Sequence, residues 1–296
     1  MHPLISADDL LARASDPDLR IVDVRFDLAD PEAGRRRYRA GHLPGAVYLH
    51  LDEDLSGPLR PDGIGGRHPL PDPDRLAQRL GRSGIGDAHE VIVYDDAGGA
   101  MAGRLWWLLH WIGRPRVRVL DGGLAAWRAA GGATSDAPVD PVPADSSAAP
   151  KPSMVASAEQ VRDGIGRDDV VLFDARAPER YRGETEPLDR KAGHVPGARN
   201  RPYAGNLLQD GRFRAPEALA RRFAPARSAD RAVVYCGSGV TAAHDALAMV
   251  VAGLPMPVLY AGSWSDWSSR DGWPVATGDE DDGGADDAQS PHGARG

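Results

Sequence analysis

The sequence predicts an α/β protein built from two similar units in tandem, each with a central parallel β-sheet flanked by helices. Three observations support this fold class. Short β-branched runs alternate with helical segments, the motifs of the first half recur in the second half, and a stretch rich in Pro, Ala and Ser separates the halves. Short apolar strands joined through helices are typical of parallel sheets covered on both faces. In such sheets, ligands bind beyond the carboxyl ends of the strands.

Four motifs carry the repeat, and their offsets stay between 140 and 152 positions, so only loop lengths differ between the halves. The matching pairs are Asp23–Arg25 with Asp174–Arg176, Gly41–Ala46 with Gly193–Ala198, Val91–Tyr94 with Ala232–Tyr235, and Asp121–Trp127 with Ala261–Trp267. Four matches in the same order are not expected by chance, and they indicate a duplicated unit.

Each unit is expected to begin with a helix whose first turn has capping-box spacing, at Ser6 with Asp9 and at Ser157 with Gln160. Buried strands are expected at 21–24, 91–94 and 117–120, and again at 170–173, 232–235 and 257–260. The middle strand of each set leads into a helix, over 100–112 and 240–252, and the last strand leads into a Trp-bearing helix. We therefore expect one unit over 1–132, a linker over 133–152, a second unit over 153–276 and a disordered acidic tail over 277–296.

The composition is that of a soluble globular protein, with 42% apolar and 26% charged residues in a chain of 296. There is no apolar run of about 18 residues and no secretory signal, so we expect a cytoplasmic protein without a membrane partner. The tail carries −5 of the net charge of −8, and the nearly balanced remainder does not fit a nucleic-acid partner. The single cysteine, Cys236, excludes an intramolecular disulfide and a cysteine-rich metal site, and we expect no metal or cofactor.

Cys236 stands at the point where a parallel sheet would place chemistry, directly after the strand expected at 232–235 and before a helix. The intervening loop, Gly237-Ser238-Gly239-Val240-Thr241, should turn successive backbone N–H groups inward and form an anion-binding nest. We expect Cys236 to exist there largely as a thiolate, and Gly237, Gly239, Val240 and Thr241 to bind the transferred group. A lone cysteine is often only a small buried hydrophobe, but this setting favours a nucleophile.

The first half offers an internal comparison, because Asp95 stands in the place of Cys236 after the strand expected at 91–94. A carboxylate cannot act as a sulfur nucleophile. We therefore expect the unit over 1–132 to be catalytically silent.

The two Gly-His-x-Pro-Gly-Ala elements, the loop Cys236–Thr241 and the segment Ser263–Trp267 resemble the tandem-domain rhodanese-type sulfurtransferases, a family that includes 3-mercaptopyruvate and thiosulfate sulfurtransferases. The resemblance covers nearly the whole chain except the tail. It implies two rhodanese-like domains, of which only the second is active. It also implies that Cys236 takes a sulfur atom from a small donor, holds it as a persulfide and passes it to a thiol acceptor, such as thioredoxin, or to cyanide.

The loop also indicates the donor. Family members that prefer thiosulfate carry basic side chains at the second and third loop positions, where this chain has Gly237 and Ser238. The pair resembles the branch that uses 3-mercaptopyruvate. There, the loop serine, a histidine and an aspartate are proposed to relay a proton, and the matching residues are Ser238, His68 and Asp54, with Asp52 two positions away.

A donor carboxylate calls for arginine. The family's arginine-aromatic-x-Gly element matches Arg180 in Arg180-Tyr181-Arg182-Gly183, and the nearest match to its second arginine is Arg190, with Arg182 as a substitute.

Two other functions remain open, and a third is disfavoured. Thiosulfate is an alternative donor, and a persulfide carrier without turnover is a second possibility. A cysteine phosphatase also places a thiolate under backbone amides, but its Cys-x5-Arg loop needs an arginine where this chain has Ala242.

Overall fold

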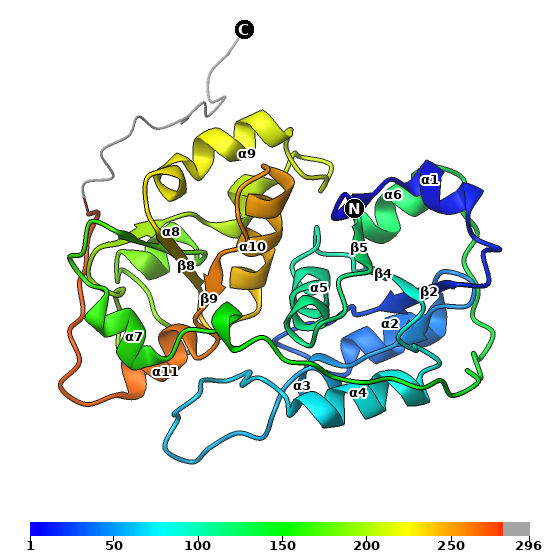
Figure 1. The fold of residues 1–296 in the computed structure, drawn as a ribbon, viewed down its shortest axis with the longest axis horizontal. Helices are drawn as coiled ribbons and strands as arrows, with labels where there is room; N and C mark the ends of the chain where they lie inside the picture. Colours follow the sequence, from blue (N-terminus) through cyan, green and yellow to red (C-terminus); the bar gives the residue numbers. More distant parts are fainter. Residues whose placement is uncertain (281–296) are drawn as a thin grey trace, which may run out of the picture.

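The computed structural model describes residues 1–280 and folds each half around its own parallel sheet, which confirms the predicted α/β class (Figure 1). The first sheet has the order β1-β5-β4-β2-β3, and every strand pair in it is parallel. Its strands are β1 (Leu4–Ile5), β2 (Leu19–Asp23), β3 (Val47–Tyr48), β4 (Glu90–Tyr94) and β5 (Val117–Leu120).

The second sheet repeats the centre of the first in the order β7-β6-β8-β9, again with parallel pairs only. Its strands are β6 (Val170–Asp174), β7 (Ala198–Asn200), β8 (Arg231–Tyr235) and β9 (Val258–Leu259). The register matches as well, since Asp23 pairs with Tyr94 as Asp174 pairs with Tyr235. Cys236 and Asp95 therefore follow the same point of the two sheets.

Helices cover the faces of both sheets. In the first half they are α1 (Ala7–Ala12), α2 (Ala33–Ala40), α3 (Leu51–Asp54), α4 (Pro73–Arg82), α5 (Ala102–Trp111) and α6 (Gly123–Ala129). In the second half they are α7 (Ala158–Asp163), α8 (Pro178–Tyr181), α9 (Pro216–Arg222), α10 (Thr241–Val251) and α11 (Ser263–Ser269), with short 3-10 turns at Pro152–Met154, Tyr203–Asn206 and Ala224–Arg227. The Ser157–Gln160 capping box is present, whereas at Ser6 the serine side chain accepts from Asp9 N–H. No helix of the described residues is long and apolar enough to cross a membrane.

The repeated Asp-x-Arg motifs pin the turn that follows the first long strand of each half. Arg176 forms a buried ion pair with Asp174 and donates to the carbonyl of Gly193, at distances of 2.7 Å each. Arg25 makes the same contacts with Asp23 and Gly41. This shared arrangement holds the Gly-His-x-Pro-Gly-Ala segment at the strand end and explains why both halves keep both motifs.

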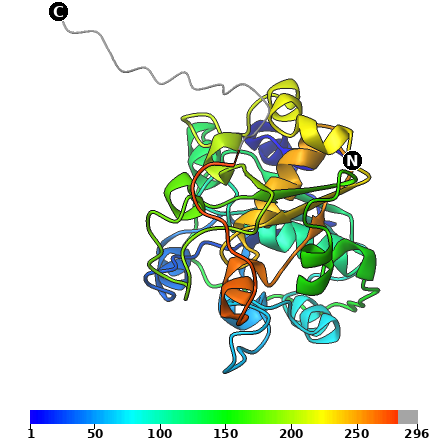
Figure 2. The same cartoon turned by 90° about the vertical axis from the view of Figure 1, so that its left-hand side faces the viewer.

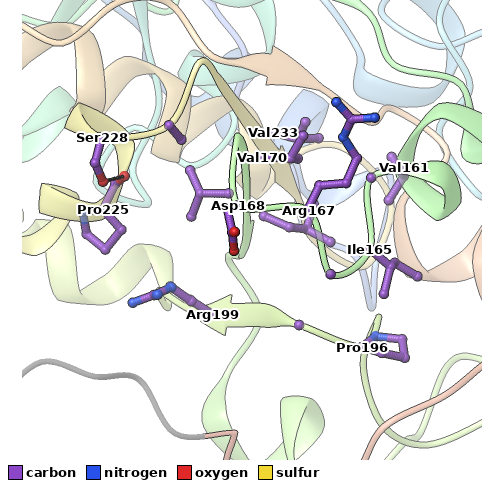
Figure 3. Close-up of a pocket in the computed structure, with 16 residues that line it drawn as sticks. Val161, Ile165, Arg167, Asp168, Val170, Pro196, Arg199, Pro225, Ser228 and Val233 are labelled. Carbon is purple, nitrogen blue, oxygen red and sulfur yellow. Dashed lines mark hydrogen bonds between the residues drawn. The ribbon is translucent and has the colours of Figure 1, made fainter.

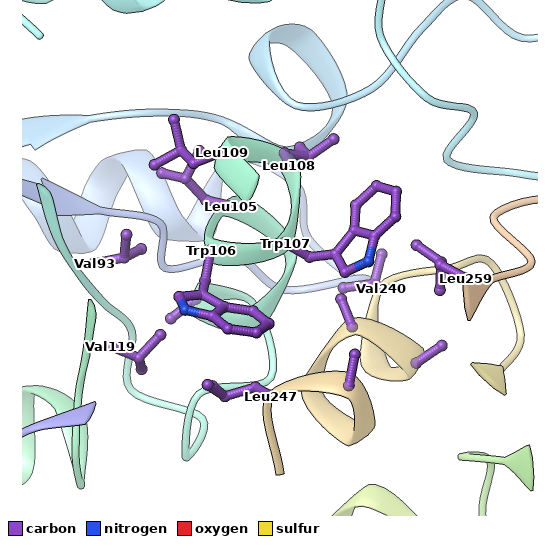
Figure 4. Packing of buried hydrophobic residues seen from close by; sticks show 14 of the residues in the cluster. Val93, Leu105, Trp106, Trp107, Leu108, Leu109, Val119, Val240, Leu247 and Leu259 are labelled. Carbon is purple, nitrogen blue, oxygen red and sulfur yellow. The ribbon is translucent and has the colours of Figure 1, made fainter. Parts of the chain in front are cut away.

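The two halves share one hydrophobic core, which lies where α5 packs against α10 (Figure 4). Trp106 and Trp107 of α5 are fully buried in it, with Val240 and Leu247 of the second half in the same cluster. The helix axes approach closely, since an ideal Cβ built on Gly103 would lie 3.1 Å from the Cα of His244. The halves are therefore fixed against each other, and a site can use side chains from both.

Residues 133–151 contain no helix or strand beyond an isolated bridge at Ser135, and they run along the first half. Backbone bonds tie this segment down, for example from Ala149 N–H to the carbonyl of Ile112, at 2.9 Å. In the end view of Figure 2 the second half lies in front of the first. The tail expected over 277–296 lies mostly outside the described residues. Its first part is tied to the second domain, because Glu280 accepts a 2.7 Å bond from Gly197 N–H.

Candidate active site at the Cys236 loop

Cys236 lies at the carboxyl end of β8, where the loop turns into α10. Its side chain is only 2% exposed, and the N–H of Gly239 donates to Sγ at 3.1 Å. The backbone N–H of Cys236 is held by Ser263 Oγ, also at 3.1 Å. The sulfur is therefore fixed in orientation and already accepts one backbone donor, as a nucleophile in an amide cradle should.

Three carbonyls of the cysteine loop accept hydrogen bonds from outside the loop. Those of Cys236 and Gly237 accept from the N–H groups of Trp264 and Ser265 in α11, at 2.9 and 3.0 Å. The carbonyl of Gly239 accepts from Arg104 at 3.0 Å. In the described part of the chain, no backbone partner is found for the N–H groups of Gly237, Ser238, Val240 and Thr241, so these groups remain as donors for an anion.

Gly239 has to be glycine for this turn to form. Its φ of +79° is in the left-handed region, and an ideal Cβ there would lie 2.4 Å from the carbonyl oxygen of Ala261. The absence of a side chain at Gly239 therefore lets the cysteine loop pack directly against the turn between β9 and α11.

The first half shows what such a cradle accepts. The Asp95 carboxylate receives four backbone N–H groups, from Ala97, Gly99, Met101 and Ala102, at 2.8 to 2.9 Å. The same offsets from Cys236 fall on Ser238, Val240, Ala242 and Ala243. The loop of the first half therefore binds a buried carboxylate, and the corresponding loop of the second half has Cys236 in its place.

A chain of polar contacts joins the loop of Cys236 to the first half of the protein. His68 Nδ1 is 2.7 Å from Ser238 Oγ, and its Nε2 is 3.2 Å from an oxygen of Asp52. Burial lowers the pKa of His68, so the ring is neutral at pH 7, although the bond to Asp52 opposes this shift. A neutral ring that donates from Nε2 to the carboxylate has a free lone pair on Nδ1, so Ser238 donates its O–H there. The bond from His68 lowers the pKa of Asp52 in turn.

The structure brings Asp52 to His68, and not Asp54, which the sequence analysis had favoured. Asp54 instead accepts from Arg79 Nε at 2.6 Å and from the N–H of His50 at 2.8 Å. The two aspartates stand two positions apart on α3, and side chains at that spacing point to opposite sides of a helix. The assignment of Asp54 to the relay is therefore corrected to Asp52.

Of the predicted arginines, Arg180 is beside the loop and Arg190 is not. An ideal Cβ built on Gly237 would lie 3.3 Å from Nη1 of Arg180. Arg190 is exposed and donates to the carbonyl of Ser269 at 3.4 Å. Arg182 pairs with Glu184 at 2.7 Å on the surface, so it does not take the place of Arg190 beside the loop. Arg67 was not predicted, although it directly precedes His68, and its Nη2 lies 3.1 Å from the same Cβ position.

A second missed residue is Arg104 of α5, which is fully buried beneath the loop. It donates to the carbonyls of Gly239 and His68 at 3.0 Å each, and to that of Pro69 at 3.2 Å. Burial lowers its pKa to about 10, and the nearby Cys236 opposes this shift. Arg104 is therefore charged at neutral pH and ties the relay loop to the cysteine loop.

Two other features of the molecule lie away from this site. A cavity of about 290 Å³ is lined by residues that include Asp168, Val170 and Arg199, and it lies at the amino end of the second sheet, opposite Cys236 (Figure 3). Glu32, His50 and Glu53 have ligand atoms close together. However, His50 Nδ1 accepts from backbone N–H groups and Nε2 lies 3.1 Å from the carbonyl of Pro31, so neither nitrogen is available to a metal.

The fold and this loop define a tandem-domain protein with one cysteine cradle and one carboxylate cradle. Residues 6–130 and 157–270 each match the family model of the rhodanese-like domain. The chain belongs to the rhodanese family.

Relatives match over nearly the whole length. A Pseudomonas aeruginosa protein named "Probable 3-mercaptopyruvate sulfurtransferase" is 49% identical over 280 residues, covering 93% of this chain and 98% of that protein. A Mycobacterium tuberculosis relative that bears the name of a thiosulfate sulfurtransferase is 41% identical over 285 residues, covering 93% and 97%. The crystal structure of SseA from Escherichia coli, described among 3-mercaptopyruvate sulfotransferases, superposes with a TM-score of 0.77 at 30% identity and covers 89% of this chain and 99% of that one.

Proposed function

We propose that this protein is a sulfurtransferase that moves sulfur from 3-mercaptopyruvate to a thiol, such as that of thioredoxin, or to cyanide, through a persulfide on Cys236. The contact of His68 with both Ser238 and Asp52 carries the proposal. A relay of this kind serves a donor whose leaving group must gain a proton, which is true of pyruvate enolate and not of sulfite. The lone thiol and the absence of a membrane-spanning helix in the described residues support a cytoplasmic location.

In the first half-reaction the Cys236 thiolate attacks the donor sulfur. A sulfur–sulfur bond forms, the carbon–sulfur bond breaks, and the electron pair moves to C3 of the departing pyruvate as its enolate. Ser238 takes the proton of the donor thiol while passing its own to His68, and the reverse transfer delivers a proton to C3. Asp52 stabilises the imidazolium formed in between. The products are pyruvate and a persulfide anion, which the loop N–H groups stabilise.

In the second half-reaction an acceptor thiolate or cyanide attacks the outer sulfur of the persulfide. The sulfur–sulfur bond breaks, the acceptor gains the sulfur, and Cys236 returns as a thiolate. We propose that the first domain takes no part through its own cradle, because Asp95 fills it. Instead, the first domain supplies His68 and Asp52 to the second.

Replacing Ser238 by alanine tests the relay and the donor together. We expect kcat/KM for 3-mercaptopyruvate to fall by about 10² to 10⁴ fold, the usual contribution of a positioned acid or base. Transfer from thiosulfate should change by less than about threefold, because sulfite leaves without needing a proton. Initial rates of pyruvate or sulfite release with cyanide as acceptor give both values. Equal losses with the two donors contradict the relay.

The lowered pKa of His68 gives a pH dependence with a definite sign. Protonation of the buried ring removes the lone pair that accepts from Ser238, so the relay is intact above the His68 pKa and lost below it. We expect kcat/KM for 3-mercaptopyruvate to decline only below about pH 6.5, the ordinary value of histidine. Replacing Asp52 by Asn should move this acid limb further down, because the carboxylate favours the protonated ring. An upward movement contradicts the assignment of Asp52.

Thiosulfate stays the second candidate donor, since Arg67 and Arg180 supply positive charge beside Gly237 even though the loop itself has none. In the unmodified protein, we expect 3-mercaptopyruvate to have the higher kcat/KM. A thiosulfate preference of about tenfold, which is 1.4 kcal/mol in transition-state stabilisation, contradicts the proposed donor. Loading that stops after one sulfur per chain indicates a carrier instead of an enzyme.

A further inference from the structure

Two arginines from different halves of the chain approach the same backbone position beside Cys236. An ideal Cβ on Gly237 would lie 3.1 Å from Nη2 of Arg67 and 3.3 Å from Nη1 of Arg180. Neither of these two nitrogens has a hydrogen-bond partner among the described residues, and neither is a buried orphan. They are donors that remain open to a ligand.

The first half delivers Arg67 through a loop that is fastened to the second half. The N–H of Gly65 donates to Asp266 at 3.2 Å, and the N–H of Arg67 donates to Ser265 Oγ at 3.0 Å. Gly66 makes the close approach possible, because a Cβ there would lie 2.4 Å from the carbonyl oxygen of Gly262. The position of Arg67 is therefore set by the same docking that places His68.

A third residue, Asp189, holds the two guanidinium groups together. Its side chain is 3% exposed, pairs with Nη1 of Arg67, and accepts from Nη2 of Arg180 at 3.1 Å. Arg180 is also held by Glu186 at 2.7 Å. Each arginine thus binds a buried carboxylate through one of its nitrogens and places another nitrogen beside Gly237. Two guanidinium donors at one backbone position suit the two oxygens of a carboxylate.

We propose that Arg67, which comes from the first half, is a further residue that binds the carboxylate of the donor at Gly237, in the place that the family resemblance gave to Arg190 and beside Arg180, to which the resemblance already gives that role. The inference rests on the proposed function and adds a residue, Arg67, that selects a donor with a carboxylate. Gly237 adjoins Cys236, and the thiol of 3-mercaptopyruvate lies two carbon atoms beyond the carboxylate carbon. A carboxylate anchored at Gly237 therefore leaves the sulfur free to reach Sγ. Because Arg67 comes from the first half, that half contributes to donor selection as well as to the relay.

Alkylation of Cys236 tests the carboxylate site without any sulfur transfer. Iodoacetate and iodoacetamide differ by a carboxylate against a neutral amide, so the ratio of their second-order rate constants isolates binding of the carboxylate. We expect Arg67→Gln to lower this ratio by about tenfold, as the loss of a charge-assisted fork implies. Arg67→Lys should lower it less, because the charge stays and the fork is lost. The matched control is Arg60→Gln, since Arg60 is an exposed arginine of the same loop that pairs with Asp62.

Donor kinetics give the second measurement. Arg67→Gln should raise KM for 3-mercaptopyruvate by about tenfold and change kcat by less than about threefold, because the lost contact binds donor and transition state alike. An unchanged alkylation ratio in Arg67→Gln overturns the inference, as does a lowered ratio in Arg190→Gln beside a normal one in Arg67→Gln. Failure of both reagents to reach the sulfur overturns it too. If the ratio falls as expected and 3-mercaptopyruvate is not turned over, the carboxylate site stands and the proposed donor does not.

Discussion

Replacing Cys236 by serine is expected to abolish sulfur transfer from either donor, with kcat lowered by about 10⁴ fold or more. Serine preserves the shape of the loop, including an acceptor for the Gly239 N–H that now lies 3.1 Å from Sγ. However, its hydroxyl stays protonated at neutral pH and forms no stable bond to a sulfane sulfur. Pyruvate release from 3-mercaptopyruvate, followed with a dithiol acceptor, measures the loss. Mass spectrometry after donor treatment should find one added sulfur on the native chain and none on the variant.

The control for this variant is Asp95→Asn at the corresponding point of the first domain. We expect activity per folded molecule to be unchanged, because the cradle of Asp95 faces no substrate. Stability should nevertheless fall. An amide presents one oxygen to four N–H donors where the carboxylate presents two, so at least one N–H is left facing an NH₂ group. Such a loss costs about 1–3 kcal/mol for each buried donor. Loss of transfer in a folded Asp95→Asn protein contradicts a silent first domain.

The sequence predicted the elements that are built from local signals. Each of the six expected strands matches a strand of the structure within two residues at either end, because short β-branched runs bounded by turns are unambiguous in a doubly covered sheet. The short edge strands Leu4–Ile5, Val47–Tyr48 and Ala198–Asn200 went unpredicted. Two or three residues carry too little periodicity to stand out from a loop, and their pairing is decided by the sheet they join.

Site residues were likewise predictable where they depend on neighbours in sequence, and not where they depend on contacts between distant segments. The position of Cys236 follows from the strand, the glycines and the helix beside it in sequence. The choice of Asp52 over Asp54 depends on which side of α3 faces His68, and two aspartates so close in sequence give no sign of this before the helix is placed. Arg67 and Arg104 act on a loop more than a hundred positions away in sequence. A chain with 33 arginines offers no local reason to select them.

Arg104 is the clearest case of a residue whose role exists only in the assembled molecule. Arg104 lies on α5 of the first domain and donates to the carbonyl of Gly239 in the second domain. In the opposite direction, Nε2 of His244 on α10 lies 3.0 Å from the carbonyl oxygen of Gly98 in the first domain. Each domain's buried helix thus braces the other domain's cradle. Of these two side chains, Arg104 is the cation, and it lies close enough to Cys236 for the two to interact electrostatically. This difference between the domains agrees with the two loops they support. The Cys236 loop would have to stabilise an anion that forms during the reaction, whereas the Asp95 carboxylate is already bound by four N–H groups.

Replacing Arg104 by methionine is expected to lower the free energy of unfolding by on the order of 3 kcal/mol, because the carbonyls of Gly239, His68 and Pro69 lose a charged donor that no water can replace. For a chain of this size that corresponds to a Tm about 6–12 °C lower, measurable by calorimetry. Transfer should fall as well, since the relay and cysteine loops lose their common anchor and the sulfur loses a nearby cation.

Arg104→Lys separates the effect of the positive charge from the effect of the hydrogen bonds that join the two loops. Lysine keeps the positive charge near Cys236 but cannot reach three carbonyls at once. We therefore expect it to retain the rate of Cys236 alkylation by iodoacetamide, which should fall in Arg104→Met, while recovering only part of the lost stability. Arg116→Met, which removes an arginine that only bonds the carbonyl of Ala88 at the surface, should leave both quantities unchanged. If the alkylation rate stays unchanged in Arg104→Met, then Arg104 acts on the stability of the two loops alone.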